Sequence, residues 1–181
     1  MRTAKTVLTV IQERGKQKKP IERVYKLLFN RELYLNAYAK LYPNNGAMTK
    51  GVTNETVDGM SIQKIDRMIE ILREEKYQWK PARREYIKKK NGKKRPLGIP
   101  VWGDKVLQEV MRQILEAYYE PQFSKHSHGF RPNRGCHTAL QEIQVWKGTR
   151  WFIEGDIKGF FDNIDHGVMI SILEKRISDE R

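Results

Sequence analysis

The sequence has little cysteine, few acidic side chains and no long apolar run. Its only cysteine, Cys136, cannot form an internal disulfide and has no partner at a metal-binding spacing, so we predict no redox chemistry. No apolar run approaches the roughly 18 residues that a membrane-spanning helix needs. The first residues lack the apolar core of a signal peptide, and Glu13 is unusual in a transit peptide. We therefore expect an intracellular protein with no membrane partner.

Positive charge is abundant. Lysine and arginine total 35 against 22 acidic residues, which gives the 181-residue chain a formal net charge of +13. Such an imbalance says little about the fold, but it favours a polyanion as the binding partner. The length allows one good hydrophobic core or two small ones.

The pattern of apolar residues predicts an α+β chain that is mostly helical. Helices are predicted over residues 1–14, from Pro20 to about 41, from Ser61 to before 79, over 106–118, over 136–147 and over 166–177. Two loops rich in glycine and polar residues, 44–60 and 126–135, separate some of them, and long loops of this kind are often functional.

A basic hairpin is predicted over residues 83–101, with a tight turn at Asn91–Gly92. One explanation of its lysines is that they only prevent pairing with another sheet edge. A second explanation is phosphate binding, because Arg95 lies between a lysine and a proline in extended backbone. A rigidly held guanidinium suits bidentate contact with a phosphate.

Residues 151–156 predict a buried strand that ends at Asp156, followed by a backbone turn at Gly159. Asp156 either caps this turn or holds Mg²⁺ together with a backbone carbonyl such as that of Ile157. Asp162 and Asp165 are predicted to be turn and helix-start residues. No later strand is available to pair with residues 151–156, so either the hairpin pairs with them or the sequence is part of a longer protein.

Four motifs, in this order and at these separations, resemble one known family. They are KKNGKKRPLGIP, VLQEVMRQILEAYYEPQF, HGFRPNRGCHTAL and GDIKGFFDNIDH. From about Leu33 onward the sequence is similar to the front half of the reverse transcriptases encoded by group II introns, which also act as splicing maturases. The loop NNGAMTKGV resembles the N-terminal extension of these enzymes.

The resemblance implies a fragment of the right-hand polymerase fold. It implies an N-terminal helical extension and loop over 1–60, helical fingers with the basic hairpin over 61–150, and the first strand and helix of the palm over 151–181. The tandem Asp-Asp of the family's palm occurs nowhere in this sequence. We therefore expect this fragment to bind RNA without polymerising.

The resemblance also implies roles for individual residues. Asp156 is the expected catalytic aspartate and shares a metal site with the carbonyl of Ile157. The expected nucleotide-binding residues are Lys89, Lys94, Arg95, Arg131 and Phe161, and Phe161 would contact the sugar. The expected template or RNA contacts are Lys88, Lys90, Lys93, Gly129, Phe130 and Pro132. For Phe160 and Phe161 the alternative is core packing, which we expect for one of the two, and for Phe130 and Pro132 it is loop rigidity. The four histidines are assigned no chemistry.

The activity implied for the parent protein is RNA-directed DNA synthesis with two Mg²⁺ ions. The implied partners are intron RNA, an RNA template with a DNA primer, and deoxynucleoside triphosphates, and self-association stays open. The implied location is the bacterial cytoplasm or an organelle. One alternative is an RNA-binding splicing module without polymerase activity. Another is a related reverse transcriptase from a defence system or a diversity-generating element.

Overall fold

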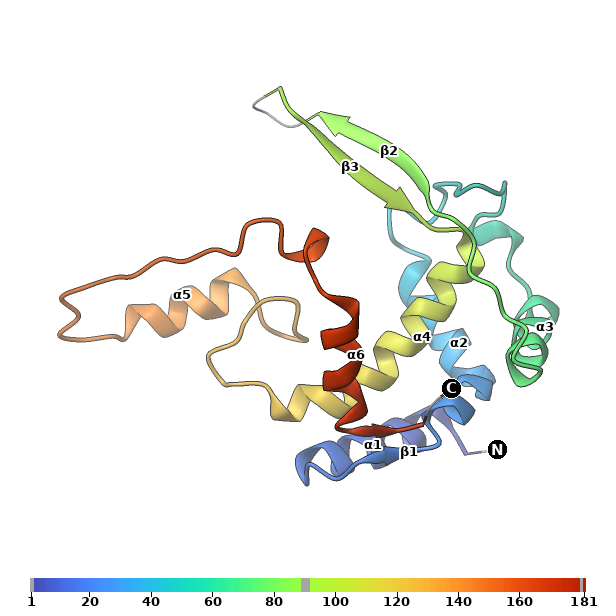
Figure 1. Cartoon of the computed structure of the whole chain (residues 1–181), viewed down its shortest axis with the longest axis horizontal. Helices are drawn as coiled ribbons and strands as arrows, with labels where there is room; N and C mark the ends of the chain where they lie inside the picture. The colour runs from blue at the N-terminus through green and yellow to red at the C-terminus, as the bar shows by residue number, and fades with distance from the viewer. Residues whose placement is uncertain (1, 89–91, 180) are drawn as a thin grey trace.

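The computed structural model describes residues 2–88, 92–179 and 181 as a mixed α/β fold dominated by helices (Figure 1). The α-helices are α1 (Ala4–Lys16), α2 (Arg31–Leu41), α3 (Ile62–Arg73), α4 (Trp102–Tyr119), α5 (Cys136–Gln144) and α6 (His166–Glu174). Short 3₁₀ helices are η1 (Val24–Phe29), η2 (Val57–Gly59), η3 (Glu120–Gln122) and η4 (Phe160–Asp162). The strands are β1 (Ile21–Glu22), β2 (Arg83–Lys88), β3 (Lys94–Ile99) and β4 (Ile177–Ser178).

Helix α4 lies at the centre of the hydrophobic core. Its apolar stripe recurs at helical spacing, so one face of α4 packs against α1 and α2. The residues on this stripe with 0–1% exposed surface are Val106, Leu107, Val110, Ile114 and Tyr118. The buried cluster also includes Leu33, Tyr34 and Ala37 of α2 and Ile65, Ile69 and Leu72 of α3. The described residues include no helix that is long and apolar enough to cross a membrane.

The predicted starts of α3 and α6 are confirmed, and a capping side chain is present at each. The Ser61 hydroxyl accepts a hydrogen bond from the Lys64 amide at 3.2 Å, and the Asp165 carboxylate accepts one from the Val168 amide at 3.0 Å. Each cap satisfies an amide that has no partner within its own helix. Asp165 is therefore a helix-start residue, as predicted.

The helix predicted from Pro20 to residue 41 is wrong in its first half. Residues 21–22 form β1, Arg23 takes a left-handed backbone conformation with φ of 55°, and the 3₁₀ turn η1 follows. The α-helix begins only at Arg31, after Asn30 accepts a hydrogen bond from the Glu32 amide at 3.0 Å. A positive φ at an arginine breaks the helical repeat that apolar periodicity alone had suggested.

Two small sheets are present among the described residues. Strands β2 and β3 form the predicted antiparallel hairpin, which projects from the helical body (Figure 1). Strands β1 and β4 pair in parallel, with Ile21 opposite Ile177, and this pair ties the C-terminal segment back to the first helix region. Gly92 has a φ of 78°, as a tight turn requires, while Asn91 lies outside the described residues.

The strand predicted at residues 151–156 is not formed. These residues belong to no ladder, and Trp151, Phe152 and Ile153 are exposed. The hairpin does not pair with them, because β2 and β3 pair only with each other. A strand-forming sequence without a neighbouring strand has no partners for its amides and carbonyls, so no sheet forms here.

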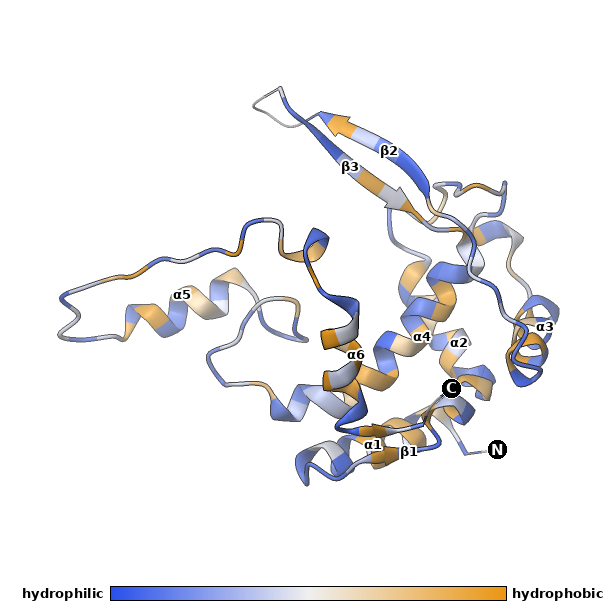
Figure 2. Cartoon of the chain, viewed as in Figure 1, coloured by the Kyte–Doolittle hydropathy of each residue, from blue (hydrophilic) through white to orange (hydrophobic). Residues whose placement is uncertain are grey.

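Apolar side chains are also exposed on the helix that follows. Val168, Met169, Ile170 and Ile172 of α6 are each at least 42% exposed. Figure 2 shows α6 as a largely apolar helix beside α4. The exposed apolar side chains of α6 contrast with the charged hairpin.

Helices α1 and α4 approach each other closely at Gly15. A Cβ added at Gly15 would lie 2.1 Å from the Tyr118 carbonyl oxygen. Only glycine fits here, and the contact lets the apolar faces of the two helices interlock.

We predict that Gly15→Ala lowers the free energy of unfolding by about 2–3 kcal/mol, because a backbone atom rather than a flexible side chain blocks the new methyl group. The measurement is urea unfolding followed by circular dichroism. Gly46→Ala is the matched control, since nothing lies within 4 Å of its added Cβ. Equal stability of the two variants would contradict the prediction.

Candidate nucleic-acid interface

The two faces of the hairpin differ in charge. Side chains alternate along a strand, so Lys88 and Lys94, which are directly opposite, share one face with Arg84 and Tyr86. All four are exposed. Like charges directly across a ladder destabilise a hairpin by roughly 0.2–1 kcal/mol, so this face suits a polyanion that would neutralise them.

Arg95 lies on the opposite face of the hairpin. It pairs in the ladder with Ile87, and both are exposed. Lys94 and Arg95 are consecutive in β3, so their side chains point to opposite faces of the hairpin. In this geometry they cannot both bind one phosphate. Of the other predicted contacts, Lys93 is exposed beside the tip, and Lys89 and Lys90 lie outside the described residues.

The base of the hairpin is anchored on α4 by Asp104. This carboxylate is 2% exposed and accepts hydrogen bonds from the Tyr77 hydroxyl at 2.6 Å and the Lys80 amide at 3.0 Å. Burial, and then the bond to Asp104, raise the pKa of Tyr77 far above its ordinary value. The segment that enters β2 is therefore fixed by a buried carboxylate, and none of the sequence-based predictions included it.

Loop 44–60 is ordered by contacts from α4 and the hairpin. The Lys105 ammonium donates to the carbonyl oxygens of Gly46 and Thr49 at 3.2 and 3.1 Å. Arg83 donates to the Lys50 carbonyl at 3.1 Å. Burial lowers the pKa of Lys105 below its ordinary value. This loop is thus attached to the same end of α4 as the hairpin.

Arg131 holds loop 126–135 together from within. Its guanidinium donates to Glu120 of η3 and to the carbonyl oxygens of Ser124 and Ser127, at 2.7–3.2 Å. It also lies over the Phe123 ring, and its side chain is only 8% exposed. These contacts favour a positioning role for Arg131 over the nucleotide-binding role that we predicted for it.

Phe130 is at the tip of the same loop and is fully exposed. Its φ of 56° lies in the left-handed region, which costs a residue other than glycine on the order of 1–3 kcal/mol. Asn133 has the same φ of 56°, Pro132 between them is exposed, and nothing lies within 4 Å of a Cβ added at Gly129. The loop therefore holds an aromatic ring in solvent at an energetic cost, which suits stacking on a base.

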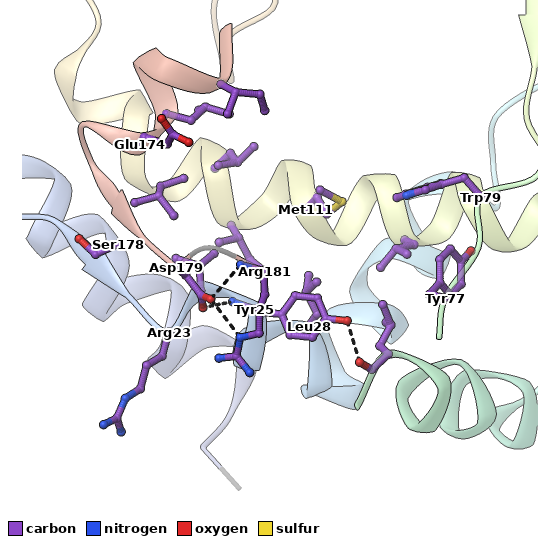
Figure 3. A pocket seen from close by; sticks show the side chains of 18 residues that line it. Arg23, Tyr25, Leu28, Tyr77, Trp79, Met111, Glu174, Ser178, Asp179 and Arg181 are labelled. Atoms are coloured by element: carbon purple, nitrogen blue, oxygen red, sulfur yellow. Dashed lines mark hydrogen bonds and ion pairs between the residues drawn. The ribbon is translucent and has the colours of Figure 1, made fainter. Parts of the chain in front are cut away.

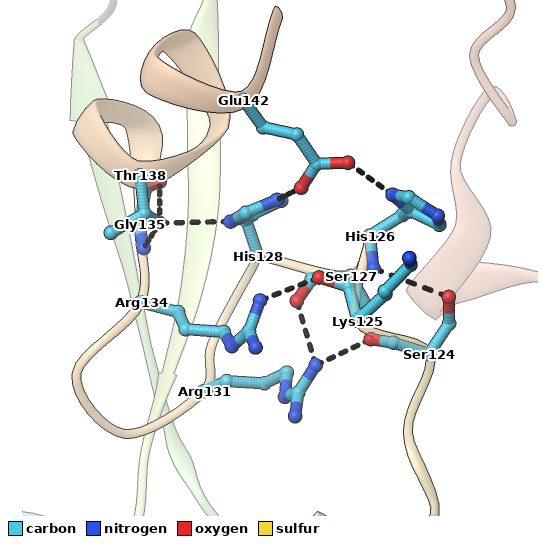
Figure 4. Close-up of polar contacts among 10 residues, drawn as sticks. All are labelled: Ser124, Lys125, His126, Ser127, His128, Arg131, Arg134, Gly135, Thr138 and Glu142. Carbon is cyan, nitrogen blue, oxygen red and sulfur yellow. Dashed lines mark hydrogen bonds and ion pairs between the residues drawn. The ribbon is translucent and has the colours of Figure 1, made fainter.

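A carboxylate on α5 joins the loop to the helix (Figure 4). Glu142 contacts the Nδ1 atom of His126 with one oxygen and the Nε2 atom of His128 with the other, the second at 2.9 Å. The hydrogen bonds from His126 and then His128 lower the pKa of Glu142. The sequence analysis did not predict this cluster. The only signal for it in the sequence is that His126 and His128 lie two residues apart, shortly before a predicted helix.

Asp156 is exposed and has no hydrogen-bond or ion-pair partner among the described residues. The capping alternative therefore has no hydrogen bond to support it, and the turn depends on Gly159, whose φ is 62°.

Phe160 and Phe161 pack edge to face on each other, with ring centroids 5.5 Å apart. Neither ring is buried, so the prediction that one of them packs in the core is wrong here.

The described residues do not supply a complete metal site. Asp156 and the Ile157 carbonyl offer at most a few oxygen ligands, whereas Mg²⁺ needs octahedral coordination. No three His, Cys, Asp or Glu side chains in the described part of the chain come together to hold an ion.

A groove of about 1300 Å³ lies between η1, α4, α6 and β4 (Figure 3). Its walls are mainly apolar and include Leu28, Met111 and Trp79. Near one end, Asp179 accepts a hydrogen bond from the Tyr25 amide at 2.9 Å, and Arg181 lies over the Tyr25 ring. The residues that line it include none of those predicted to bind nucleotide or template.

Comparison with known proteins matches residues 87–179 to the family described as "Reverse transcriptase (RNA-dependent DNA polymerase)". The group II intron-encoded protein LtrA of Lactococcus lactis subsp. cremoris is 52% identical over 87% of this chain and 26% of its own length. An uncharacterised 91 kDa protein in the cob intron of Schizosaccharomyces pombe is 46% identical over 98% of this chain and 23% of its own. Protein YkfC of Escherichia coli K12 is 37% identical over 89% of this chain and 45% of its own.

The chain spans about a quarter of the length of the first two relatives. The matched family region contains most of the hairpin, the loop with Phe130 and the segment with Asp156. The chain therefore belongs to the reverse transcriptase family, among the proteins encoded by group II introns.

Proposed function

We propose that the chain is the fingers and the beginning of the palm of a right-hand polymerase, and that it binds single-stranded RNA. The observation that carries the RNA-binding proposal is the exposed pair of directly opposed lysines, Lys88 and Lys94, with Tyr86 on the same face. Cations that follow a backbone, together with an aromatic ring that stacks on a base, are the usual components of single-strand binding. The exposed ring of Phe130 supplies a second stacking position.

We propose the same division of the chain that the resemblance implies: 1–60 as N-terminal extension and loop, 61–150 as fingers, and 151–181 as the start of the palm. The polymerase would synthesise DNA on an RNA template from deoxynucleoside triphosphates and would assist splicing of its intron. It would act in a bacterial cytoplasm or an organelle, and bacterial and yeast proteins among its relatives support this.

For the chemistry, Arg95 is proposed to bind the triphosphate. Of the two partners that the resemblance implies, Lys89 is kept, because Lys94 points to the opposite face of the hairpin from Arg95. Phe161 is proposed to contact the sugar, Gly129 and Pro132 to shape the template loop, and Lys90 and Lys93 to contact RNA. Asp156 and the carbonyl of Ile157 would contribute oxygen ligands to Mg²⁺. Because no second carboxylate joins Asp156 in the described residues, we propose that this chain alone does not polymerise.

The alternative function is an RNA-binding splicing module without polymerase activity. The lack of a metal-binding group of three side chains in the described residues favours it for this chain taken alone. The two functions can be distinguished at Asp156. Only the polymerase function requires this residue for DNA synthesis by a larger protein that carries this chain.

We predict that the RNA affinity of this chain falls steeply with salt and that Lys88→Gln with Lys94→Gln weakens the dependence. Contact with about six phosphates gives a slope of about −4 to −5 in log K against log salt, and each lost contact removes roughly 0.7–0.9. The measurement is fluorescence anisotropy of labelled oligouridylate at several salt concentrations. Lys26→Gln with Lys175→Gln is the control, because it removes the same charge from exposed positions elsewhere. A flat salt response, or equal effects of the two double variants, would contradict the prediction.

Phe130→Ala should lower the affinity for the same RNA by roughly five- to a hundredfold, because stacking of one base on an aromatic ring contributes about 1–3 kcal/mol. Phe130→Tyr keeps the ring and should bind like the parent chain. If both variants bind equally well, the exposed ring has no role in binding RNA.

In a complete reverse transcriptase that carries this chain, Asp156→Asn should lower primer extension by more than about a hundredfold, since loss of even a second-sphere partner of a metal costs 10–100-fold. RNA affinity should not change, because the exposed carboxylate makes no described contact. Asp162→Asn is the matched control, and it should extend primers normally. Full primer extension by the Asp156 variant would exclude the polymerase role, and templated, Mg²⁺-dependent product from this chain alone would exclude its proposed inactivity.

A further inference from the structure

Loop 44–60 touches the hairpin at both of its ends (Figure 1). At the start of β2, the Nε atom of Arg83 donates to the Lys50 carbonyl oxygen at 3.1 Å. After β3, a Cβ added at the buried Gly51 would lie 2.8 Å from the Cα and backbone nitrogen atoms of Val101. The backbone of the loop therefore lies directly against the backbone that joins β3 to α4.

The loop meets the face of the hairpin that carries Arg95. Residues an even number of positions apart on a strand share a face, so Arg83 is on the same face as Ile87, which is directly opposite Arg95. The contact between Arg83 and the loop is made on that face. Lys88 and Lys94 are on the other face, so the loop supports the hairpin from behind its opposed lysines.

The hairpin needs such support because its strands pack mainly on each other and project from the helical body (Figure 1). Two connections attach it to α4. One is the segment before β2, where Asp104 accepts a hydrogen bond from the Lys80 amide at 3.0 Å, and the other is the junction of β3 with α4. A ribbon attached at two points can rotate about the line that joins them. A contact on one face of the ribbon opposes that rotation.

Lys105 fixes the position of the loop. Its ammonium donates to the carbonyl oxygens of Gly46 and Thr49 at 3.2 and 3.1 Å, and it lies 6.0 Å from the ring centroid of Trp102, which is 3% exposed. Hydrogen bonds from a charged donor are stronger than those between neutral groups. Because Lys105 follows Asp104, one turn of α4 holds both the loop and the segment that enters β2.

We propose that Lys105 is a positioning residue. By holding loop 44–60 against both ends of the hairpin, it fixes the angle at which the hairpin presents Lys88 and Lys94 to RNA. This inference rests on the proposed RNA-binding function. An ammonium has three donors, and Lys105 uses two of them on the loop while its side chain is partly buried. It therefore acts through the hairpin and not as a phosphate contact of its own.

The direct test is the distribution of distances between two spin labels in the whole chain without RNA, measured by double electron–electron resonance. The labels are placed on Val52→Cys in the loop and Ile87→Cys on the hairpin, both exposed positions, and exposed Cys136 is replaced by serine. The parent should give a narrow distribution and Lys105→Met a broader one. Lys64→Met is the matched control, because it removes an equal charge and an exposed ion pair with Glu55 of the same loop, and it should stay narrow.

A second variant tests the same support without changing charge. Gly51→Ala places a methyl group against the backbone of Val101, so it should push the loop away from the hairpin and broaden the distribution. Gly46→Ala makes the same change in the same loop where nothing lies within 4 Å of the added Cβ, and it should behave like the parent. A broad distribution in the parent would overturn the proposal, and this result needs no variant to fold. Distributions as narrow as the parent's in both Lys105→Met and Gly51→Ala would also overturn it.

The affinity for oligouridylate tests the link to RNA. Lys105→Met should lower it by about two- to fivefold, because a hairpin that holds the binding orientation for part of the time binds in proportion to that fraction. In the Lys88→Gln, Lys94→Gln double variant the same change should have a smaller effect, because the lysines that the loop positions are absent. An equal loss in both backgrounds would mean that Lys105 contacts RNA independently, and it would overturn the positioning role.

This proposal and the proposed function fail in different ways. If the Lys88→Gln, Lys94→Gln double variant binds RNA like the parent while Lys105→Met broadens the distribution, the support by the loop is real and the RNA-binding role of the hairpin is wrong. If the double variant binds more weakly while Lys105→Met keeps the narrow distribution and the parent's affinity, the RNA-binding role is supported and the positioning role is wrong.

Discussion

The packing of α4 against α1 and α2 is the constraint on which the rest of the structure depends. The buried stripe from Val106 to Tyr118 fixes α4 in the core, and Gly15 allows α1 to approach its C-terminal end. The first turn of α4 carries Asp104 and Lys105, which hold the hairpin base and loop 44–60. Just beyond its last turn, Glu120 holds loop 126–135 through Arg131. Asp104 and Glu120 are 16 residues apart, so at about 1.5 Å per residue roughly 24 Å separates the two groups of contacts, and one rigid helix positions both candidate RNA-binding regions.

The charge of the chain is distributed so that part of it remains available to a ligand. Several cations are used internally: Lys105 binds loop carbonyls, Arg112 pairs with Glu109 and Glu116, and Arg131 pairs with Glu120. On the hairpin, by contrast, Lys88 and Lys94 face each other directly. Two like charges at this position weaken the isolated hairpin, and a phosphate backbone between them would remove that cost. The arrangement therefore combines a helical body in which several cations are paired internally with a hairpin whose opposed lysines face each other.

The segment from Trp151 to α6 differs from the helical body around α4, because no described strand pairs with residues 151–156. Trp151, Phe152 and Ile153 have the composition of a buried strand but are exposed, and the apolar residues of α6 are exposed beside them. The pair of β1 with β4 holds the end of this segment near α1 without forming a palm sheet. The family match through residue 179 places this segment within the reverse transcriptase domain. No sheet forms around residues 151–156 because no described strand pairs with them. The lack of this sheet does not bear on the proposed role of Asp156.

The sequence alone determined the features that depend on neighbours a few residues apart. Apolar periodicity and caps such as Ser61 and Asp165 gave most helices, alternation and the turn at Gly92 gave the hairpin, and four ordered motifs gave the family. It could not determine that Arg23 would interrupt a helix, that Arg131 would turn inward to Glu120, or that Glu142 would meet two histidines 14 and 16 residues away. It also predicted a strand at 151–156 that did not form. These outcomes belong to the tertiary structure, because an ion pair or a strand ladder requires two distant segments to be brought together, and only the packing around α4 decides which segments meet.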